Sequence, residues 1–246
     1  MPERIETIAT PDGGMETFIA EPQGEARRHV ILYMDVWGIR DELYDIARGL
    51  ARYGLVCLLP DLYYREGRVR HDFRDAEGRA RTLLSLTPAE QEHVRGPMRR
   101  LTDAMVMADT RALLGRMNAT RAAVAIGYCM GGRHALVAGG TFPHVIRAAA
   151  SLHGSHIVDA SADSPHIVAA RIAGEAYCGF AERDPFAAEH VIDALRRQFA
   201  ETGARLVYRV HRGAEHGYAL PDRDVHDAEA TRADWTAIHA MIDRID

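Results

Sequence analysis

The feature of this sequence that most restricts its fold is the alternation of short apolar runs with longer segments of helical periodicity. Apolar runs suited to buried strands lie at 29–35, 55–61, 121–128, 145–154, 171–184 and 204–217. Segments expected to be helical lie at 40–54, 95–119, 129–140, 185–203 and 222–245. Strands that alternate with helices form parallel sheets, because each helix returns the chain to the same edge. We therefore expect an α/β protein whose twisted sheet is mainly parallel and has helices on both faces.

Two other regions complete the expected organisation. The opening segment 4–22 reads as two short strands around a Pro-Asp-Gly-Gly turn. Residues 62–96 are polar, rich in arginine and weakly periodic, so we expect a loop with short helices that covers the sheet as a cap. The sequence contains no internal repeat, low-complexity tract or linker, and residues 1–246 are therefore interpreted as a single domain.

Composition and charge exclude several classes of function. The chain has 246 residues, of which 47% are hydrophobic, enough to bury one sizeable core. Thirty Lys and Arg residues against 35 Asp and Glu give a net charge of −5, unlike the basic surface of a nucleic-acid-binding protein. No run approaches the ~18 apolar residues of a membrane span, and residues 1–14 do not resemble a signal peptide. We expect neither a nucleic-acid nor a membrane partner.

Cysteine usage points to a reducing compartment. The chain contains Cys57, Cys129 and Cys178, an odd number with no CxxC spacing. Such a sparse set is typical of reduced thiols and not of a disulfide framework. Cys57 and Cys178 lie inside expected strands and are assigned to the core. We expect a cytoplasmic protein that is a monomer or a small homo-oligomer.

The stretch "AIGYCMGGRHAL" carries the strongest indication of chemistry. Gly127, Cys129 and Gly131 form a Gly-x-Cys-x-Gly pattern between an expected strand and an expected helix. This is the context of a nucleophile elbow, with cysteine in place of serine, and its tight turn requires glycines on both sides. The N-terminus of a helix favours thiolate over thiol, and the backbone N–H of Met130 is placed to bind an oxyanion. The alternative is that Cys129 is only a small buried residue in a glycine-rich turn.

A cysteine nucleophile needs a histidine to handle its proton and an acid to orient that histidine. Asp184 follows one expected strand and His216 follows the next, so both belong to the same sheet edge as Cys129. Their order along the chain, nucleophile, acid, histidine, is that of α/β-hydrolases. The alternatives are a surface histidine at 216 and a helix N-cap at Asp184, which is compatible with an orienting role.

Several other residues are candidates for the walls of a pocket at this edge. Trp37, Tyr128 and His153 lie at expected strand ends, and Arg133 lies one turn into the helix that follows Cys129. Core packing or a solvated helix face explains each of them equally well. The pair of histidines in "HGSH" (153–156) lacks further ligands at a suitable spacing, so we expect neither a metal site nor a cofactor.

With these residues assembled, the chain resembles the dienelactone hydrolase family of α/β-hydrolases. The matching segments, in family order from about residue 29 to residue 220, are "MDVWGIR", "LLPDLYYR", "GYCMGGRHAL", "SLHGS", "DSPH", "GEAYCGFAERD" and "GAEHGYA". The resemblance implies an α/β-hydrolase fold, a Cys129–His216–Asp184 triad and an oxyanion hole formed by the backbone N–H groups of Val36 and Met130.

The chain departs from the family pattern at two positions. Asp35 stands where family members carry a glutamate that holds the resting thiol, and its side chain is one methylene shorter. Leu220 stands four residues after the histidine, where the dienelactone enzymes have an arginine that binds the substrate carboxylate. Arg223, Arg95 and Arg99 are the other arginines considered for that contact.

The expected function is hydrolysis of small esters or lactones through a thioester on Cys129. Small-molecule esters or lactones are then the expected partners. One alternative is an acyltransferase on the same fold, which would pass the acyl group to an acceptor other than water. Another is a noncatalytic redox sensor or binding protein, in which Cys129 is an oxidisable thiol without turnover.

Overall fold

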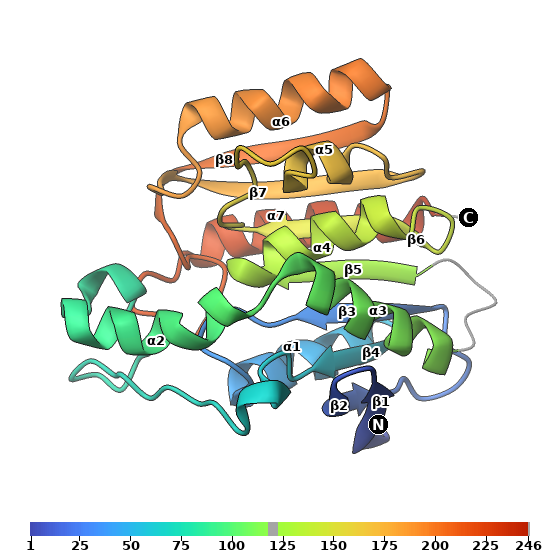
Figure 1. The fold of residues 1–246 in the computed structure, drawn as a ribbon, viewed down its shortest axis with the longest axis horizontal. Coiled ribbons are helices and arrows are strands. Elements are labelled where there is room, and N and C mark those ends of the chain that lie inside the picture. Colours follow the sequence, from blue (N-terminus) through green and yellow to red (C-terminus); the bar gives the residue numbers. More distant parts are fainter. Residues whose placement is uncertain (118–122, 246) are drawn as a thin grey trace.

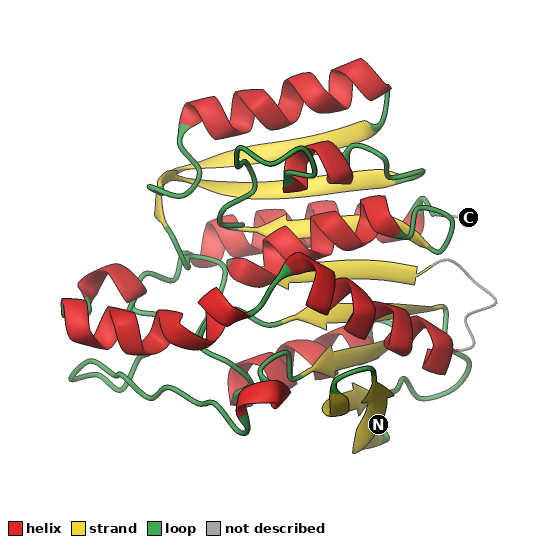
Figure 2. Ribbon diagram, in the orientation of Figure 1, coloured by secondary structure: helices red, strands yellow, loops and turns green. Residues whose placement is uncertain are grey.

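The computed structural model describes residues 1–117 and 123–245. Its centre is an eight-stranded sheet with the order β1-β2-β4-β3-β5-β6-β7-β8, flanked by helices (Figure 1, Figure 2). The strands are β1 (Glu3–Thr10), β2 (Gly13–Ala20), β3 (Arg28–Tyr33), β4 (Leu55–Pro60), β5 (Ala123–Tyr128), β6 (Ile146–Leu152), β7 (Glu175–Arg183) and β8 (Arg205–Glu215). The six strands from β4 to β8 in this order pair in parallel, and β1 and β2 form an antiparallel hairpin beside β4. The expected mainly parallel sheet is confirmed.

Helices cover both faces of this sheet, as expected. They are α1 (Asp41–Arg52), α2 (Pro88–Arg100), α3 (Asp103–Met117), α4 (Met130–Thr141), α5 (Pro165–Ala169), α6 (Glu189–Thr202) and α7 (Ala228–Asp243). Figure 1 shows α3 and α4 in front of the sheet and α7 behind it. Every residue of β5 is buried because helices pack on both of its faces, which is why that strand has no polar alternation. No helix within the described ranges is long and apolar enough to cross a membrane.

The prediction of a single helix over residues 95–119 is wrong. The described part of this segment contains two helices, because the chain leaves helical geometry at Leu101. The first of them, α2, begins earlier than expected, at Pro88, and Thr87 and Glu90 form a capping box there. Residues 118–119 of the expected helix and 121–122 of the expected strand lie outside the described residues.

Two further helices begin later than the sequence pattern indicates. The helix expected from residue 185 begins at Glu189, because residues 184–187 form a turn in which Asp184 accepts a hydrogen bond from the Phe186 backbone (2.8 Å). Asp184 is therefore not the N-cap residue of α6. The last helix begins at Ala228, where Asp227 caps it by accepting from two backbone N–H groups.

The segment expected to form a cap lies at the carboxyl ends of the strands (Figure 1). It contains two short 3-10 helices, η1 (Tyr64–Glu66) and η2 (Leu83–Ser85), and most of α2. A backbone bridge ties it to the loop before α7: Ala80 donates to the Asp222 carbonyl (2.7 Å), and Asp224 donates to the Ala80 carbonyl (3.0 Å). The cap is thus fastened to the loop that follows His216.

Helix α7 is fastened to the sheet by a buried carboxylate. Asp234, which is fully buried, accepts hydrogen bonds from the hydroxyls of Tyr177 on β7 (2.7 Å) and Tyr218 (2.6 Å), and pairs with His211 on β8 (2.6 Å). Tyr218 lies two residues after His216. Asp234 therefore positions the loop that carries His216.

Replacement of Asp234 with alanine should lower the free energy of unfolding by about 3–5 kcal/mol, because it leaves two tyrosine hydroxyls and a histidine buried without their acceptor. Urea denaturation followed by circular dichroism measures this change. Thr236→Ala, at an exposed position of the same helix, serves as the control and should change stability by less than about 0.5 kcal/mol. Equal stability of the Asp234→Ala and control variants would contradict the assignment.

Candidate active site

The backbone at Cys129 is strained in the manner of a nucleophile elbow. Its φ of 53° and ψ of −117° place a non-glycine residue in the left-handed half of conformational space. The surrounding chain holds this conformation: the Cys129 N–H donates to the Leu152 carbonyl (3.0 Å), and the Cys129 carbonyl accepts from Ser155 (3.1 Å). The thiol therefore stands at the junction of β5 and α4.

Two glycines make this junction possible. A Cβ atom on Gly127 would lie 2.0 Å from the Gly131 carbonyl oxygen, and one on Gly131 would lie 2.4 Å from the Tyr33 carbonyl oxygen. Both distances are below contact, so only glycine allows the first turn of α4 to approach β5 and β3 this closely. The pattern that predicted the turn is thus explained by backbone packing.

The structure brings together the three residues predicted to form a triad. The Cys129 Sγ lies 3.1 Å from Nε2 of His216, and Nδ1 of His216 lies 2.7 Å from Oδ2 of Asp184. All three are at most 8% exposed. The other Asp184 oxygen accepts the Phe186 N–H, which fixes the direction of the carboxylate. Each residue lies directly after a strand, β5, β7 or β8, at one edge of the sheet.

His216 is held as a cation by its partners. Burial lowers its pKa, but the neighbouring Cys129 sulfur and the hydrogen bond to Asp184 outweigh burial and raise the pKa to about 10. Two rings fix the imidazole from the sides, Phe186 at 4.9 Å and His153 at 5.0 Å between ring centroids. The arrangement is suited to keeping a thiolate and an imidazolium in contact.

The Tyr63 hydroxyl connects the two segments whose backbone N–H groups are expected to bind an oxyanion. Met130 is the first residue of α4, where backbone N–H groups have no partner within the helix. Val36 follows β3 on the other side of the thiol. The Tyr63 hydroxyl donates to the Val36 carbonyl (3.2 Å) and lies 3.6 Å from the Met130 sulfur, so it holds the two segments together.

Asp35 has partners other than the thiol contact that the family resemblance implies. Its carboxylate accepts from Arg40 (2.7 Å and 3.2 Å), from Arg223 and from the Trp37 backbone (3.1 Å). Burial raises its pKa, but the two guanidinium groups outweigh burial and lower it to about 2. Asp35 is therefore an ion-pair partner that shapes the turn containing Val36.

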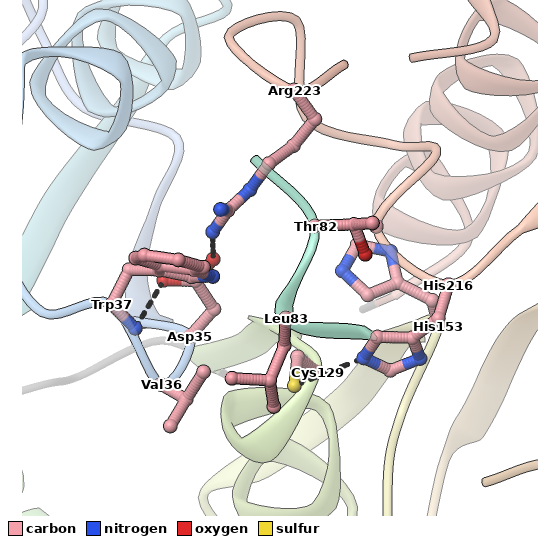
Figure 3. A pocket seen from close by; sticks show the side chains of 10 residues that line it. Asp35, Val36, Trp37, Thr82, Leu83, Cys129, His153, His216 and Arg223 are labelled. Atoms are coloured by element: carbon pink, nitrogen blue, oxygen red, sulfur yellow. Dashed lines mark hydrogen bonds and ion pairs between the residues drawn. The ribbon is translucent and has the colours of Figure 1, made fainter. Parts of the chain in front are cut away.

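A small pocket surrounds the thiol (Figure 3). It is lined by Asp35, Val36, Trp37, Thr82, Leu83, Cys129, His153, His216, Gly217 and Arg223. Its free volume of about 20 Å³ admits a single water molecule. Figure 3 shows Leu83, from the cap, beside Cys129. The free space next to the thiol is therefore small, and Leu83 of the cap narrows it.

The structure separates the candidate pocket residues into two groups. Trp37 and His153 line the pocket, as expected. Tyr128 is fully buried in the core, with its ring 5.8 Å from that of His153. Arg133 points away from the pocket and pairs with Asp103 of α3 (2.6 Å), and therefore joins two helices.

The remaining candidates have structural surroundings of their own. His156 is exposed against Phe186, apart from the buried His153, and no group of three or more His, Cys, Asp or Glu residues within the described ranges is placed to hold a metal ion. Leu220 is fully buried in the core. Of the three arginines considered for carboxylate binding, Arg223 lines the pocket.

Three residues near the thiol were not identified from the sequence. Leu83 and Thr82 lie in the weakly periodic cap, whose pattern gives no indication of which residue faces the sheet. Ser155, whose hydroxyl lies 3.8 Å from the thiol, belongs to the "HGSH" segment, whose histidines alone were interpreted, as candidates for the pocket wall or for metal binding. Its place directly after β6, next to β5 in a parallel sheet, is the signal that could have indicated proximity to Cys129.

Titration of His216 should depend on Cys129. In the native protein we expect a pKa of about 10, and in Cys129→Ala a lower value, because the thiolate is removed while burial remains. Nitrogen-15 NMR of the imidazole measures both. Since the pKa is raised from 6.5, protonated His216 stabilises the fold most below pH 6.5, and this contribution is lost as the pH rises toward 10. His239 of α7 is the control and should titrate identically in both proteins; an unchanged His216 would contradict the coupling.

Comparison with known proteins agrees with this geometry. The family model described as "Dienelactone hydrolase family" matches residues 15–245. A Salmonella typhi protein named "Putative carboxymethylenebutenolidase" is 24% identical over 241 residues, covering 94% of this chain and 83% of the relative.

Solved structures show the same fold. The crystal structure of a "Putative Dienelactone Hydrolase" from Klebsiella pneumoniae has a TM-score of 0.83 at 18% identity, covering 99% of this chain and 98% of that one. A dienelactone hydrolase-like promiscuous phosphotriesterase from metagenomic libraries has a TM-score of 0.74 at 19% identity, covering 100% and 99%. The α/β-hydrolase fold expected from the sequence is confirmed, and the chain belongs to the dienelactone hydrolase family.

Proposed function

We propose that this protein hydrolyses small esters or lactones, with Cys129 as the nucleophile. The observation that carries the proposal is the continuous series of contacts from the Cys129 thiol through His216 to Asp184, at a strained turn between a strand and a helix. Membership of the dienelactone hydrolase family, and relatives whose printed name is carboxymethylenebutenolidase, support an ester or lactone as the substrate.

In the first half of the reaction, the thiolate of Cys129 attacks the carbonyl carbon and forms a carbon–sulfur bond. The negative charge that develops on the carbonyl oxygen is bound by the backbone N–H groups of Val36 and Met130. The carbon–oxygen bond of the ester then breaks, and His216 gives its proton to the departing oxygen. A lactone opens in this step, and its alcohol stays attached to the acyl group.

In the second half, water cleaves the thioester. His216, now neutral, accepts a proton from the water as its oxygen attacks the carbonyl carbon. The carbon–sulfur bond breaks, the acid is released, and the thiolate–imidazolium pair is restored. Asp184 keeps Nδ1 of His216 protonated and aims Nε2 at the thiol in both halves.

The pairing of a thiolate with a cationic histidine favours ester and lactone substrates over amides. The thiolate attacks without first giving up a proton, so activation of the nucleophile is already complete. Amides need strong protonation of a poor leaving group, whereas esters and lactones have better ones. We also propose that the protein is cytoplasmic and uses no cofactor. In that compartment the free thiols of Cys57, Cys129 and Cys178 remain reduced.

Replacement of Cys129 with alanine should abolish turnover of p-nitrophenyl acetate and of a simple lactone, because the thioester cannot form. Asp184→Asn should lower kcat by about 10²- to 10⁴-fold, since His216 loses the partner that orients it. Release of p-nitrophenol and pH-stat titration of lactone opening measure these rates.

The matched control is Cys57→Ala, which removes a thiol that is fully buried in β4. This variant should keep the activity of the native protein. Substantial turnover by Cys129→Ala would refute the proposed nucleophile. Trapping of an acyl group on Cys129, seen as an added mass on the peptide that contains it, would give direct support.

A further inference from the structure

Four charged side chains form an alternating series beside the pocket. Asp222 accepts from Arg40 (2.7 Å and 3.3 Å), and Arg40 in turn pairs with Asp35 (2.7 Å). Arg223 donates to the other oxygen of Asp35 and completes the series. Two cations thus face two anions, and their charges cancel.

Arg223 is the one arginine or lysine among the described residues that line the pocket, and its guanidinium group is already bound by other groups of the protein. The side chain is 3% exposed. Its guanidinium binds Asp35 and the Arg81 carbonyl (3.3 Å), and it lies 4.5 Å above the Trp37 ring. These contacts join the cap, through Arg81, to the turn that carries Val36. Arg223 therefore holds the cap against the turn that contains Val36.

The triad adds a negative charge to the same space. In the ionised form that the proposed function requires, a Cys129 thiolate and the Asp184 carboxylate lie on either side of the single His216 imidazolium. A substrate carboxylate would thus enter a pocket with no unpaired cation and an excess of negative charge. Binding there would require either an unpaired buried charge or the separation of Arg223 from Asp35, and both are unfavourable.

His153 offers a different kind of polar contact. It is 1% exposed and lines the pocket, and its Nδ1 has no hydrogen-bond partner among the described residues. Its φ of 38° is a strained value for a residue other than glycine. Burial and the charge of His216 lower its pKa well below the ordinary value, so the ring is neutral. A neutral imidazole with a free nitrogen is suited to an uncharged oxygen of a ligand.

We propose that the site selects uncharged esters or lactones, with Arg223 retained by Asp35 and His153 contacting a neutral oxygen of the substrate. The proposal rests on the proposed function. In this proposal, the pocket discriminates against substrates that carry a negative charge.

The charge preference can be measured without turnover by alkylating Cys129. Iodoacetamide and iodoacetate differ only in that one is neutral and the other anionic, and each rate is divided by that of glutathione to remove intrinsic reactivity. We expect the normalised rate with iodoacetamide to exceed that with iodoacetate by at least 10-fold. Cys129→Ala provides the blank for the other two thiols. Equal normalised rates, or faster reaction with iodoacetate, would overturn the proposal whether or not the protein hydrolyses esters.

Hydrolysis gives a second measurement with a matched pair of substrates. Methyl 4-acetoxybenzoate and 4-acetoxybenzoate transfer the same acetyl group, and only the second carries a carboxylate. After division by their rates of alkaline hydrolysis, kcat/KM should be at least 10-fold higher for the neutral ester. A preference for the anion would overturn the inference and leave the proposed function intact. If neither ester is hydrolysed, the proposed function fails for this class, and the alkylation ratio still decides the charge preference.

Two variants separate the roles of Arg223 and His153. Arg223→Gln should change kcat/KM for both esters by the same factor, because Arg223 contacts the cap and Asp35 and neither substrate, whereas an anion receptor would lose activity mainly on 4-acetoxybenzoate. His153→Phe keeps a planar ring and should raise KM for the neutral ester by about 2- to 13-fold, the range expected for one lost hydrogen bond. An unchanged KM for His153→Phe would overturn the assigned contact.

Discussion

The close approach of the first turn of α4 to β5 and β3 is the constraint on which the site depends. Gly127 and Gly131 have no space for a side chain, so the backbone at Cys129 is forced into its strained conformation. This approach places the thiol, the N-terminus of a helix and the Met130 N–H at one point above the sheet. The parallel order of β5, β6, β7 and β8 then brings His153, Asp184 and His216 to the same edge. The strained backbone at Cys129 thus accompanies the close packing that brings these groups together.

Much of this site could be predicted because its determinants are local. The glycines that flank Cys129 report a turn formed by a few consecutive residues, and Asp184 and His216 are each placed by the end of the strand before them. A parallel sheet converts these separate strand ends into neighbours without any further information. The order of the three residues along the chain was therefore enough to place them within contact distance.

The parts that could not be predicted depend on residues far apart in the chain. Asp35 and Arg223 are 188 positions apart, and no local pattern indicates that they share an ion pair. Leu83 belongs to a segment without periodicity, so its position over the thiol is set by the bridge between Ala80 and the loop before α7. The start of α2 at Pro88 had a local signal, the Thr87–Glu90 capping box, but the apolar periodicity of the longer segment concealed it.

The charges near the thiol fall into two groups with different tasks. In the proposed triad, His216 lies between the Cys129 sulfur and the Asp184 carboxylate, and its raised pKa favours the protonated form that the proposed reaction uses on the leaving group. Around Asp35, two arginines and two carboxylates satisfy one another and hold the cap against the turn of Val36. Opening the cap must disturb the second group, since the Arg81 carbonyl and Arg223 are joined by a hydrogen bond, but it leaves the first intact. The ion pairs that hold the cap and the contacts of the proposed triad are therefore separate sets.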